Sequence, residues 1–308
     1  INILSMSAEN PTTISDSIGV VDPAFQEALK DYKPNLENID KIFDYIEKNI
    51  KERGRAIFYS KLEKGKNEMI VTDENNNIIY TEILPEKLIK IIPYFEAKEI
   101  YQLKNGKTLS YMDYSTEMMG KNVTIKSENL LKKKMNKKEA IEVLNKLRDS
   151  NSFTKNNISN IEYAKSECYD EEGNLLFTMQ IKDSKVITES QKTINENIIK
   201  MIYIVNDIDT DSGLMETYIN GKLGAIMRMK NSLPNGEAKI FYPSGKLLSI
   251  FTLENGKTNG IVKVYYENGK IQAIHNFKDN VLNGEAIEYD ENGNVIKKVL
   301  YKNGNIVK

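Results

Sequence analysis

Asn-Gly dipeptides occur nine times in the chain of 308 residues, and eight of the nine lie after residue 219. Two sets of glycines in this part repeat at intervals of 24 residues: Gly236, Gly260 and Gly284, and Gly245, Gly269 and Gly293. Asn-Gly tolerates positive φ at both central positions of a tight hairpin turn. Each unit of the period is therefore predicted to form strand, turn, strand and turn, which makes the C-terminal part of the chain a repeat array.

The apolar side chains between these glycines keep the same period. Aligned positions hold Phe241, Tyr265 and Tyr289; Leu247, Ile271 and Val295; and Leu253, Phe277 and Tyr301. Four units result, at about 212–235, 236–259, 260–283 and 284–308, of which the first is degenerate. Within one strand Leu247, Phe251 and Leu253 share a face, and because one hairpin alone is marginally stable, neighbouring units must stack to bury it. A single-layer sheet of this kind leaves its other face in contact with water.

The third unit centres on the segment Tyr265-Tyr266-Glu267-Asn268-Gly269-Lys270-Ile271. With Phe277-Lys278-Asp279-Asn280 and Asn283-Gly284-Glu285 after it, this unit resembles the variant MORN repeat, the second MORN repeat type, which is common in bacterial proteins. The resemblance covers about the last third of the chain and implies an elongated antiparallel sheet of hairpins, in a class of interaction scaffolds without catalytic residues. Bacterial members are often labelled antitoxin-like or immunity proteins, and some occur in exported or host-associated proteins. Ser212 and Asn280 stand where the period requires glycine, which predicts capped or frayed ends of the array.

The residues before the array predict a mixed region, so the expected fold class is α+β and predominantly antiparallel β. Residues 1–21 have no apolar period and predict an extended or mobile arm, and Asp22 before Pro23 predicts a short helix that reaches Lys33. A longer helix is expected to end at Gly54, with one inner face formed by Leu36, Ile39, Ile42, Phe43, Ile46 and Ile50. Strands and hairpins are predicted over 56–126, interrupted by one or two helical turns that begin at Pro85; a further helix is expected over 136–148, and strands again from about Ile158.

Three regions are therefore expected: an N-terminal arm and short helix over 1–34, an α+β region over 35–205, and the hairpin repeats over 206–308. The α+β region carries signs of a duplication, because a helix followed by strands precedes a turn at Asp73 and again a turn at Asp170. The segment Tyr169-Asp170-Glu171-Glu172-Gly173-Asn174-Leu175 is also similar to Tyr289-Asp290-Glu291-Asn292-Gly293-Asn294-Val295. We interpret the first 200 residues as helix-strand units built from relatives of the C-terminal hairpin.

Tyrosines recur along the array at Tyr218, Tyr242, Tyr265, Tyr266 and Tyr289. Tyrosine is enriched at protein interfaces, so these five are the candidate partner-binding residues. The alternative is that each packs on a neighbouring repeat, because most periodic aromatic residues are structural.

No set of residues predicts catalysis or a cofactor. His275 is the only histidine, and its aligned positions hold other bulky residues, so a sheet residue is expected there rather than a proton donor. The shortage of histidine excludes a Ser-His-Asp triad and a zinc site. Cys168, the only cysteine, aligns with Glu288 before a turn, which predicts a partly exposed and inert thiol. An enzyme site in the first 200 residues would need paired carboxylates in a pocket, such as Glu162 with Asp170.

Asp207, Asp209 and Asp211 are spaced like the first ligands of a calcium-binding loop. Such a loop also requires glycine at its sixth position and glutamate at its twelfth, where this chain has Ser212 and Tyr218. A solvated linker before the array is therefore favoured, with calcium binding as the alternative.

The chain has 43 Lys and Arg against 44 Asp and Glu, so no field of the whole protein attracts nucleic acid or an anionic membrane. The only basic cluster lacks interleaved aromatic residues, and no nucleic-acid partner is expected; it consists of Lys132, Lys133, Lys134, Lys137 and Lys138. No apolar run approaches the roughly 18 residues of a membrane span, while contact with a membrane surface stays open. The last hairpin, 294–308, predicts a route to a homodimer by pairing of edge strands.

The leading hypothesis is a non-catalytic interaction scaffold that binds a protein or a cell-surface component through its hairpin sheet. The first residue is Ile1 rather than methionine, which favours removal of a signal peptide and export to the periplasm, cell surface or medium. The alternative is a cytoplasmic immunity or antitoxin-like protein that neutralises a partner toxin by the same surface. An enzyme with its site in the N-terminal region is the third hypothesis.

Overall fold

The structure is a computed structural model that describes residues 27–28, 32–118, 120–132, 139, 158–231 and 233–307. Contacts divide the chain into two compact units, Ile1–Ser190 and Gln191–Lys308, and each is described by itself. The described residues form the helices α3 and α4 and 21 antiparallel strands, so the predicted fold class is confirmed. The predicted arm over 1–21 lies outside the described residues. So do the expected short helix and the helix over 136–148, apart from a few positions such as Glu139, which is helical.

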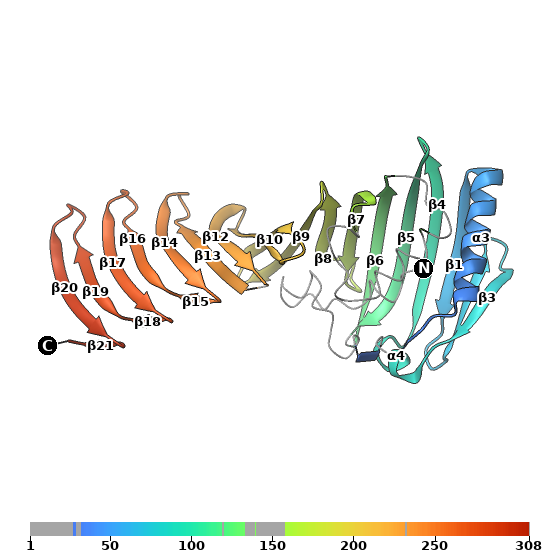
Figure 1. Cartoon of the computed structure of the whole chain (residues 1–308), viewed down its shortest axis with the longest axis horizontal. Helices are drawn as coiled ribbons and strands as arrows, with labels where there is room; N and C mark the ends of the chain where they lie inside the picture. Colours follow the sequence, from blue (N-terminus) through green and yellow to red (C-terminus); the bar gives the residue numbers. More distant parts are fainter. Residues whose placement is uncertain are drawn as a thin grey trace. The chain divides into compact units, whose positions relative to one another are not determined.

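Helix α3 (Leu36–Arg53) forms where the sequence predicts the longest helix (Figure 1). The Asn35 side chain accepts a hydrogen bond from the Glu37 backbone N–H at 3.0 Å and caps the start, while Gly54 ends the helix with a φ of 73°. Leu36 is 57% exposed, so its placement on the inner face is wrong. Helical side chains point toward the N-terminus, and that of Leu36, in the first position, therefore extends past the helix start. The other predicted inner residues are buried: Ile39, Ile42, Phe43, Ile46 and Ile50.

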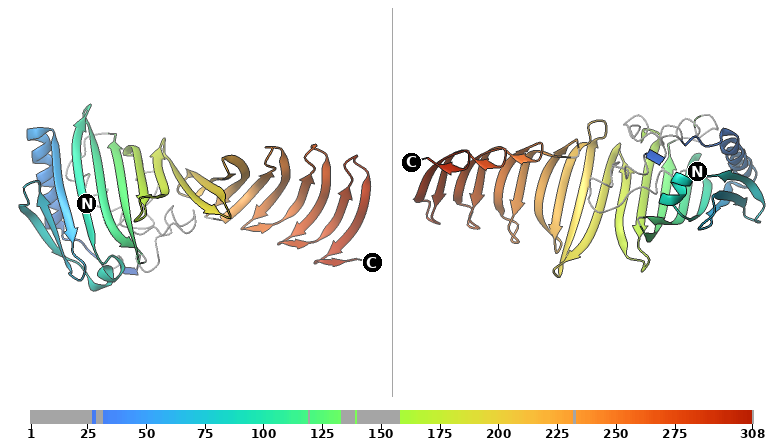
Figure 2. Two further views of the ribbon diagram at one scale, coloured as in Figure 1. Left: turned by 180° about the vertical axis from the view of Figure 1, so that it is seen from behind. Right: turned by 90° about the horizontal axis from the view of Figure 1, so that it is seen from below.

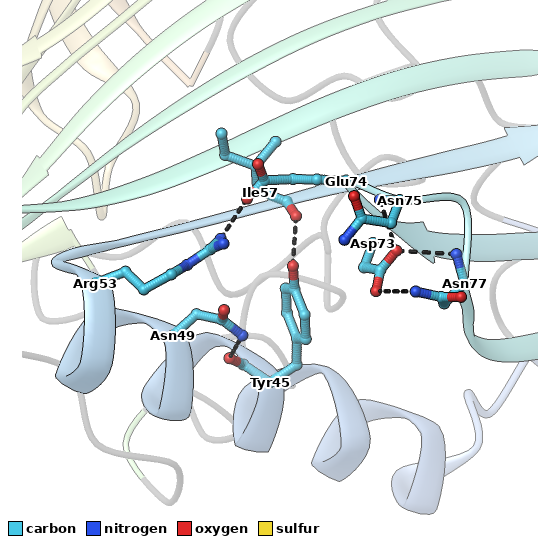
Figure 3. A network of polar contacts seen from close by, with 8 residues as sticks. All are labelled: Tyr45, Asn49, Arg53, Ile57, Asp73, Glu74, Asn75 and Asn77. Atoms are coloured by element: carbon cyan, nitrogen blue, oxygen red, sulfur yellow. Dashed lines mark hydrogen bonds and ion pairs between the residues drawn. The ribbon is translucent and has the colours of Figure 1, made fainter.

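Polar contacts fix α3 to a strand and a turn beside it (Figure 3). The Tyr45 hydroxyl donates to the backbone carbonyl of Ile57 at 2.7 Å, and Arg53 forms an ion pair with Glu74. Burial, followed by the nearby carboxylates of Asp73 and Glu74, raises the pKa of Tyr45. The raised pKa keeps the hydroxyl protonated, and therefore a hydrogen-bond donor, to higher pH than in an unperturbed tyrosine.

The sheet that begins in the first unit has the strand order β3-β2-β1-β4-β5-β6-β7-β8-β9, with antiparallel pairing between neighbours. The first unit ends at Ser190, within β9. Helix α4 (Glu86–Ile91) connects β3 to β4 after Pro85, where the sequence predicts a short helical segment. Neither α3 nor α4 is long and apolar enough to cross a membrane, and no other described helix is. The strand bounds are β1 Arg55–Leu62, β2 Glu68–Asp73, β3 Ile78–Ile83, β4 Phe95–Lys104, β5 Lys107–Met118, β6 Lys121–Leu131, β7 Ile161–Tyr169, β8 Leu175–Lys182 and β9 Lys185–Ile194.

One face of this sheet, together with α3, forms the core of the first unit. Ile42 of α3 and four strand residues, Phe58, Val71, Phe95 and Tyr114, are each at most 2% exposed. The strands alternate buried and accessible residues along their length, as a sheet with one covered face requires.

Cys168 lies on the buried face of β7 and is 2% exposed, so the predicted partly exposed thiol is wrong. The aligned turns are alike, but burial depends on what covers the strand. In β7 the cysteine lies opposite Ile125 on one side and Phe177 on the other, both of which belong to the core. Its thiol therefore behaves as a small apolar core group.

Three aspartates close turns of one kind, at Asp73, Asp170 and Asp290. In each turn Oδ1 accepts a hydrogen bond from the backbone N–H of the asparagine four residues later, at 2.9, 2.7 and 2.9 Å respectively. The side-chain amide of that asparagine donates to Oδ2, as Figure 3 shows for Asp73 and Asn77. This shared geometry supports the similarity of the hairpins that the sequence indicates, while the duplication itself stays a prediction.

The second unit is a succession of hairpins in one layer (Figures 1 and 2). Each hairpin pairs with the next through the main strands, from β10 to β20. The short strands β15, β18 and β21 pair with the ends of β14, β17 and β20. The bounds are β10 Asn197–Asp207, β11 Ser212–Ile219, β12 Lys222–Lys230, β13 Leu233–Phe241, β14 Leu247–Glu254, β15 Lys257–Thr258, β16 Gly260–Tyr265, β17 Ile271–Lys278, β18 Val281–Leu282, β19 Gly284–Tyr289, β20 Val295–Lys302 and β21 Asn305–Ile306.

The Asn-Gly dipeptides adopt three arrangements rather than one. Those with positive φ at both residues, as predicted, are Asn105-Gly106, Asn220-Gly221, Asn255-Gly256 and Asn303-Gly304. Those that close a longer loop, with positive φ at glycine alone, are Asn268-Gly269 and Asn292-Gly293. Those that lie within or between strand segments, where the repeat pattern predicts hairpin turns, are Asn235-Gly236, Asn259-Gly260 and Asn283-Gly284. A glycine with positive φ inside a strand allows the strand to bend.

The asparagines of these three bends have a separate role: each bonds to a turn residue 20 positions later in the sequence. The bonded pairs are Asn235 with Asn255 at 3.1 Å, Asn259 with Asp279 at 2.9 Å, and Asn283 with Asn303 at 3.1 Å. The bend and the following two-residue turn are thus joined by a side chain in every full repeat.

Candidate protein-interaction surface

Two of the five candidate tyrosines connect successive repeats. The Tyr242 hydroxyl donates to the backbone carbonyl of Tyr265, and the Tyr266 hydroxyl donates to that of Tyr289, both at 2.6 Å. Each bond joins residues 23 positions apart in the sequence, so each tyrosine reaches from its own turn to the end of a strand in the next hairpin. We call Tyr242 and Tyr266 the bridging tyrosines. Their hydroxyls are engaged inside the array, which is the structural alternative that the sequence left open.

The other three tyrosines, Tyr218, Tyr265 and Tyr289, do not bridge. Each is half-buried, and the hydroxyls of Tyr265 and Tyr289 bond to no residue that the structure describes. The Tyr218 hydroxyl donates to Glu216 Oε2 within its own strand at 2.7 Å. That hydrogen bond, followed by burial, raises the pKa of Tyr218. The binding role of the five tyrosines stays a prediction.

An open pocket of about 370 Å³ lies between two successive turns of the second unit. One turn is the two-residue turn Asn220-Gly221, and the other is the longer loop between β13 and β14. The pocket is lined by Lys222, Leu223, Phe241, Pro243, Ser244 and Gly245. Three of these residues are apolar, and the exposed Lys222 and Ser244 contribute one ammonium group and one hydroxyl.

The main strands of the array also carry an apolar row on one face. The pairings of Ala238 with Phe251 and of Val262 with His275 place these side chains on the same face of successive strands. Ala238 is buried, whereas the three larger side chains are half-buried. His275 packs edge-on against Phe277, with ring centroids 6.4 Å apart. His275 therefore occupies a sheet-face position, as the alignment with Phe251 predicts.

The candidate calcium ligands Asp207, Asp209 and Asp211 lie at the turn between β10 and β11 and form hydrogen bonds there. Asp207 Oδ1 accepts a hydrogen bond from the backbone N–H of Asp209 at 3.1 Å, and the buried Tyr203 hydroxyl donates to Asp211. No group of three or more His, Cys, Asp or Glu side chains that could hold a metal ion occurs among the described residues. The geometry therefore offers the calcium alternative no support.

Glu162 and Asp170 do not form a carboxylate pair. Glu162 forms an ion pair with Lys107 near the start of β7, whereas Asp170 follows the last residue of β7 and closes the turn after it. The strand separates the two side chains, so this candidate enzyme site is wrong.

Taken together, the second unit defines a class: a repeat protein made of β-hairpin rungs in a single layer, with side chains accessible on both faces. The family described as MORN repeat variant matches residues 234–255, 258–279 and 282–303. The chain therefore contains three consecutive variant MORN repeats, and the resemblance is confirmed for this part. Each match begins just before a bend glycine and ends in a two-residue turn, so the family unit coincides with the structural rung.

A comparison with curated proteins found no match. Among solved structures, a porin-like protein from Bacteroides uniformis aligns over 82% of this chain and 93% of its own, with 7% sequence identity and a TM-score of 0.16. A TM-score this low does not indicate a shared fold.

The pocket is the part of this surface that sequence reasoning missed. Tyr218 and its following residues align with Tyr242 and its following residues without a gap, so the pattern predicts equal turns at the two positions. The pairing differs instead: Ile219 pairs with Lys222 in the first turn, whereas Tyr242 bonds to Lys246 across a three-residue loop in the second. Pro243, a residue that favours the first central position of a type I turn, is the only local sign of this difference.

Proposed function

We propose that the chain is a non-catalytic interaction scaffold that binds a protein partner through the apolar face of its MORN array. The single observation that supports this most is the row of half-buried side chains on one face of the single-layer sheet, among them Phe251, Val262 and His275. Apolar and aromatic side chains that stay accessible in a contiguous row are typical of protein-binding surfaces.

The test compares two double variants of the full chain in affinity capture. Phe251→Ser with His275→Ser removes side chains from the apolar face of β14 and β17. Ile250→Ser with Ile274→Ser is the matched control, because these half-buried residues precede them in the same strands and point to the opposite face. We expect the first variant to lose the captured protein and the second to retain it, with circular dichroism confirming that both stay folded.

Equal capture by the two variants would contradict the assignment of the binding face. The alternative function, which the family resemblance implies, is a cytoplasmic protein that neutralises a toxin. It would use the same surface as an exported scaffold. The identity of the captured protein, a toxin or a surface component, distinguishes the two.

A further inference from the structure

Two successive spaces between turns of the array are each crossed by a tyrosine. Tyr242 crosses from the second turn to the Tyr265 carbonyl, and Tyr266 crosses from the third turn to the Tyr289 carbonyl. Both bonds are 2.6 Å long, and the donors are 24 residues apart, as are the acceptors. The bridging tyrosine is thus a repeated element of the rung.

The first inter-turn space lacks this bridge. By the period, Tyr218 is the counterpart of Tyr242, and the Phe241 carbonyl is the counterpart of the Tyr265 carbonyl. The Tyr218 hydroxyl bonds to Glu216 in its own strand instead. No side-chain donor within the described part of the chain reaches the Phe241 carbonyl.

The pocket of about 370 Å³ lies in this same space, since Phe241 and the residues of both turns line it. Its volume falls at the lower end of the range of ligand sites, so it has room for one aromatic side chain. Leu223, Phe241 and Pro243 supply apolar walls. The carbonyl of Phe241 is the acceptor that the repeat pattern pairs with a phenolic hydroxyl.

The charge at the pocket indicates which residues should flank an aromatic side chain inserted there. Lys222 lines the pocket, is exposed, and forms no ion pair with any described residue. An ammonium group at the edge of an apolar pocket favours a carboxylate beside the inserted group, and buried or rim charges of this kind set specificity more than affinity.

We propose that this pocket binds a tyrosine side chain of a partner protein, supplied by a segment with an acidic residue next to the tyrosine. The inserted phenol takes the place of the missing bridge: its ring lies between the two turns, its hydroxyl donates to the Phe241 carbonyl, and the neighbouring carboxylate pairs with Lys222. This inference rests on the proposed function and names one contact of the partner.

The experiment titrates the full, isotope-labelled chain with a capped tripeptide of tyrosine flanked by two glutamates, followed by NMR. Two further peptides replace tyrosine by phenylalanine or the glutamates by lysines. We expect shifts confined to the amides of Lys222, Leu223, Phe241, Ser244 and Gly245. The phenylalanine peptide should bind about three- to tenfold more weakly, because it lacks the hydrogen bond, and the lysine peptide at least about threefold more weakly.

The variant Lys222→Glu tests the site in the protein, with Lys270→Glu as the matched control two periods later. Both lysines are exposed, so neither change threatens folding. Lys222→Glu should weaken binding of the tyrosine peptide at least about threefold, and Lys270→Glu should leave its affinity unchanged. A second variant, Ser244→Trp, fills the pocket and should abolish the localised shifts.

Equal affinity for the tyrosine and phenylalanine peptides, or shifts spread along the array, would overturn the proposal. Concentration-dependent shifts of the same amides without peptide would identify a second copy of the chain as the occupant and would also overturn it. If the chain captures a partner equally well with and without Ser244→Trp, only this inference fails. If the apolar-face variant also captures it unchanged, the proposed function fails independently.

Discussion

Tyr242 and Tyr266 show how one hydroxyl can join two repeats at the scale of a single residue. Tyr265, adjacent to Tyr266, has a hydroxyl that bonds to no described residue, although both tyrosines are half-buried. Comparing variants of these two tyrosines therefore separates the contribution of the bridging hydrogen bond to stability from that of the aromatic ring.

We expect Tyr266→Phe to lower the free energy of unfolding of the array by about 0.5–1.5 kcal/mol, the usual net value of one hydrogen bond. Tyr265→Phe is the control and should change it by less than about 0.5 kcal/mol. Hydrogen exchange of the amides in β19 and β20 measures the effect where the bridge ends. Equal protection in the two variants would show that the 2.6 Å bond to Tyr289 contributes no stability.

The turn at Asp290 should depend on pH in a defined direction. The backbone N–H of Asn294, then its side-chain amide, lowers the pKa of Asp290 below 3.8. Because the folded value lies below the unfolded one, the carboxylate stabilises the turn above the unfolded pKa, and this is lost as the pH falls through the folded pKa. Side-chain NMR should give a midpoint below 3.8, and a midpoint at or above that value would contradict the turn geometry.

The 24-residue period of the sequence places the five tyrosines correctly within the repeats, but it does not determine what their hydroxyls contact. Tyr218 and Tyr242 occupy aligned positions, yet one bonds within its strand and the other to the next repeat. The outcome depends on strand register, which differs by one residue between the two hairpins: Thr217 pairs with Ala225, whereas Ile240 rather than Phe241 pairs with Ser249. A spacing of residues along the chain carries no information about such a shift.

At the scale of the element, the bends require glycine for two separable reasons. Gly284 has a φ of 118°, and a Cβ there would lie 2.9 Å from the Cβ of Asn276. Gly260 has a φ of 85° and open space around the same position. A substitution of Gly284 therefore causes both backbone strain and a steric clash, whereas a substitution of Gly260 causes backbone strain alone.

Gly260→Ala should cost about 1–3 kcal/mol, the usual cost of a side chain at positive φ. Gly284→Ala should cost more, because Asn276 must also move, and its side-chain amide bonds to the Glu285 carbonyl at 2.8 Å. Thermal unfolding of the two variants, followed by circular dichroism, measures the difference. An equal or smaller loss for Gly284→Ala would show that the close contact is relieved without cost.

Helix α3 offers a second comparison within one element. Ile42 is fully buried and Leu36 is 57% exposed, so Ile42→Ala should destabilise the first unit by about 2–5 kcal/mol. Leu36→Ala should change its stability by less than about 0.5 kcal/mol. Chemical denaturation measures both. Similar losses would mean that Leu36 contributes to the core as the helical period alone predicts.

The elements themselves were largely predictable from the sequence. Helix α3 follows from its apolar period and Gly54, and the rungs follow from the 24-residue grid. The bends were not, because Asn-Gly is compatible both with two positive φ values and with one. Which occurs is decided by long-range bonds such as that of Asn283 to Asn303, and a dipeptide does not encode these.

At the scale of the whole molecule, the two units differ in the kind of core they contain. The first has one cluster of buried residues under α3. In the second, the buried apolar residues are spread thinly along the strands: Tyr203, Val205, Met229, Ala238, Leu253, Ala273 and Ala286. Repeats of this kind are stabilised mainly by their nearest neighbours.

We therefore expect the second unit to lose protection at lower urea concentration than the first. Hydrogen exchange followed by mass spectrometry, with peptides from 55–130 and 236–303, resolves the two transitions. A single concerted transition of both segments would contradict this separation of the cores.

Several side-chain hydrogen bonds between rungs join residues 20 to 23 positions apart, as in Tyr266 with Tyr289 and Asn283 with Asn303. An in-frame gene duplication of one 24-residue segment would therefore lengthen the array and recreate every such contact at the new junction. An insertion of any other length would misalign donors and acceptors on all the rungs it separates. The protein can accordingly change its reach only in whole steps, and natural variation in length should occur in multiples of that segment.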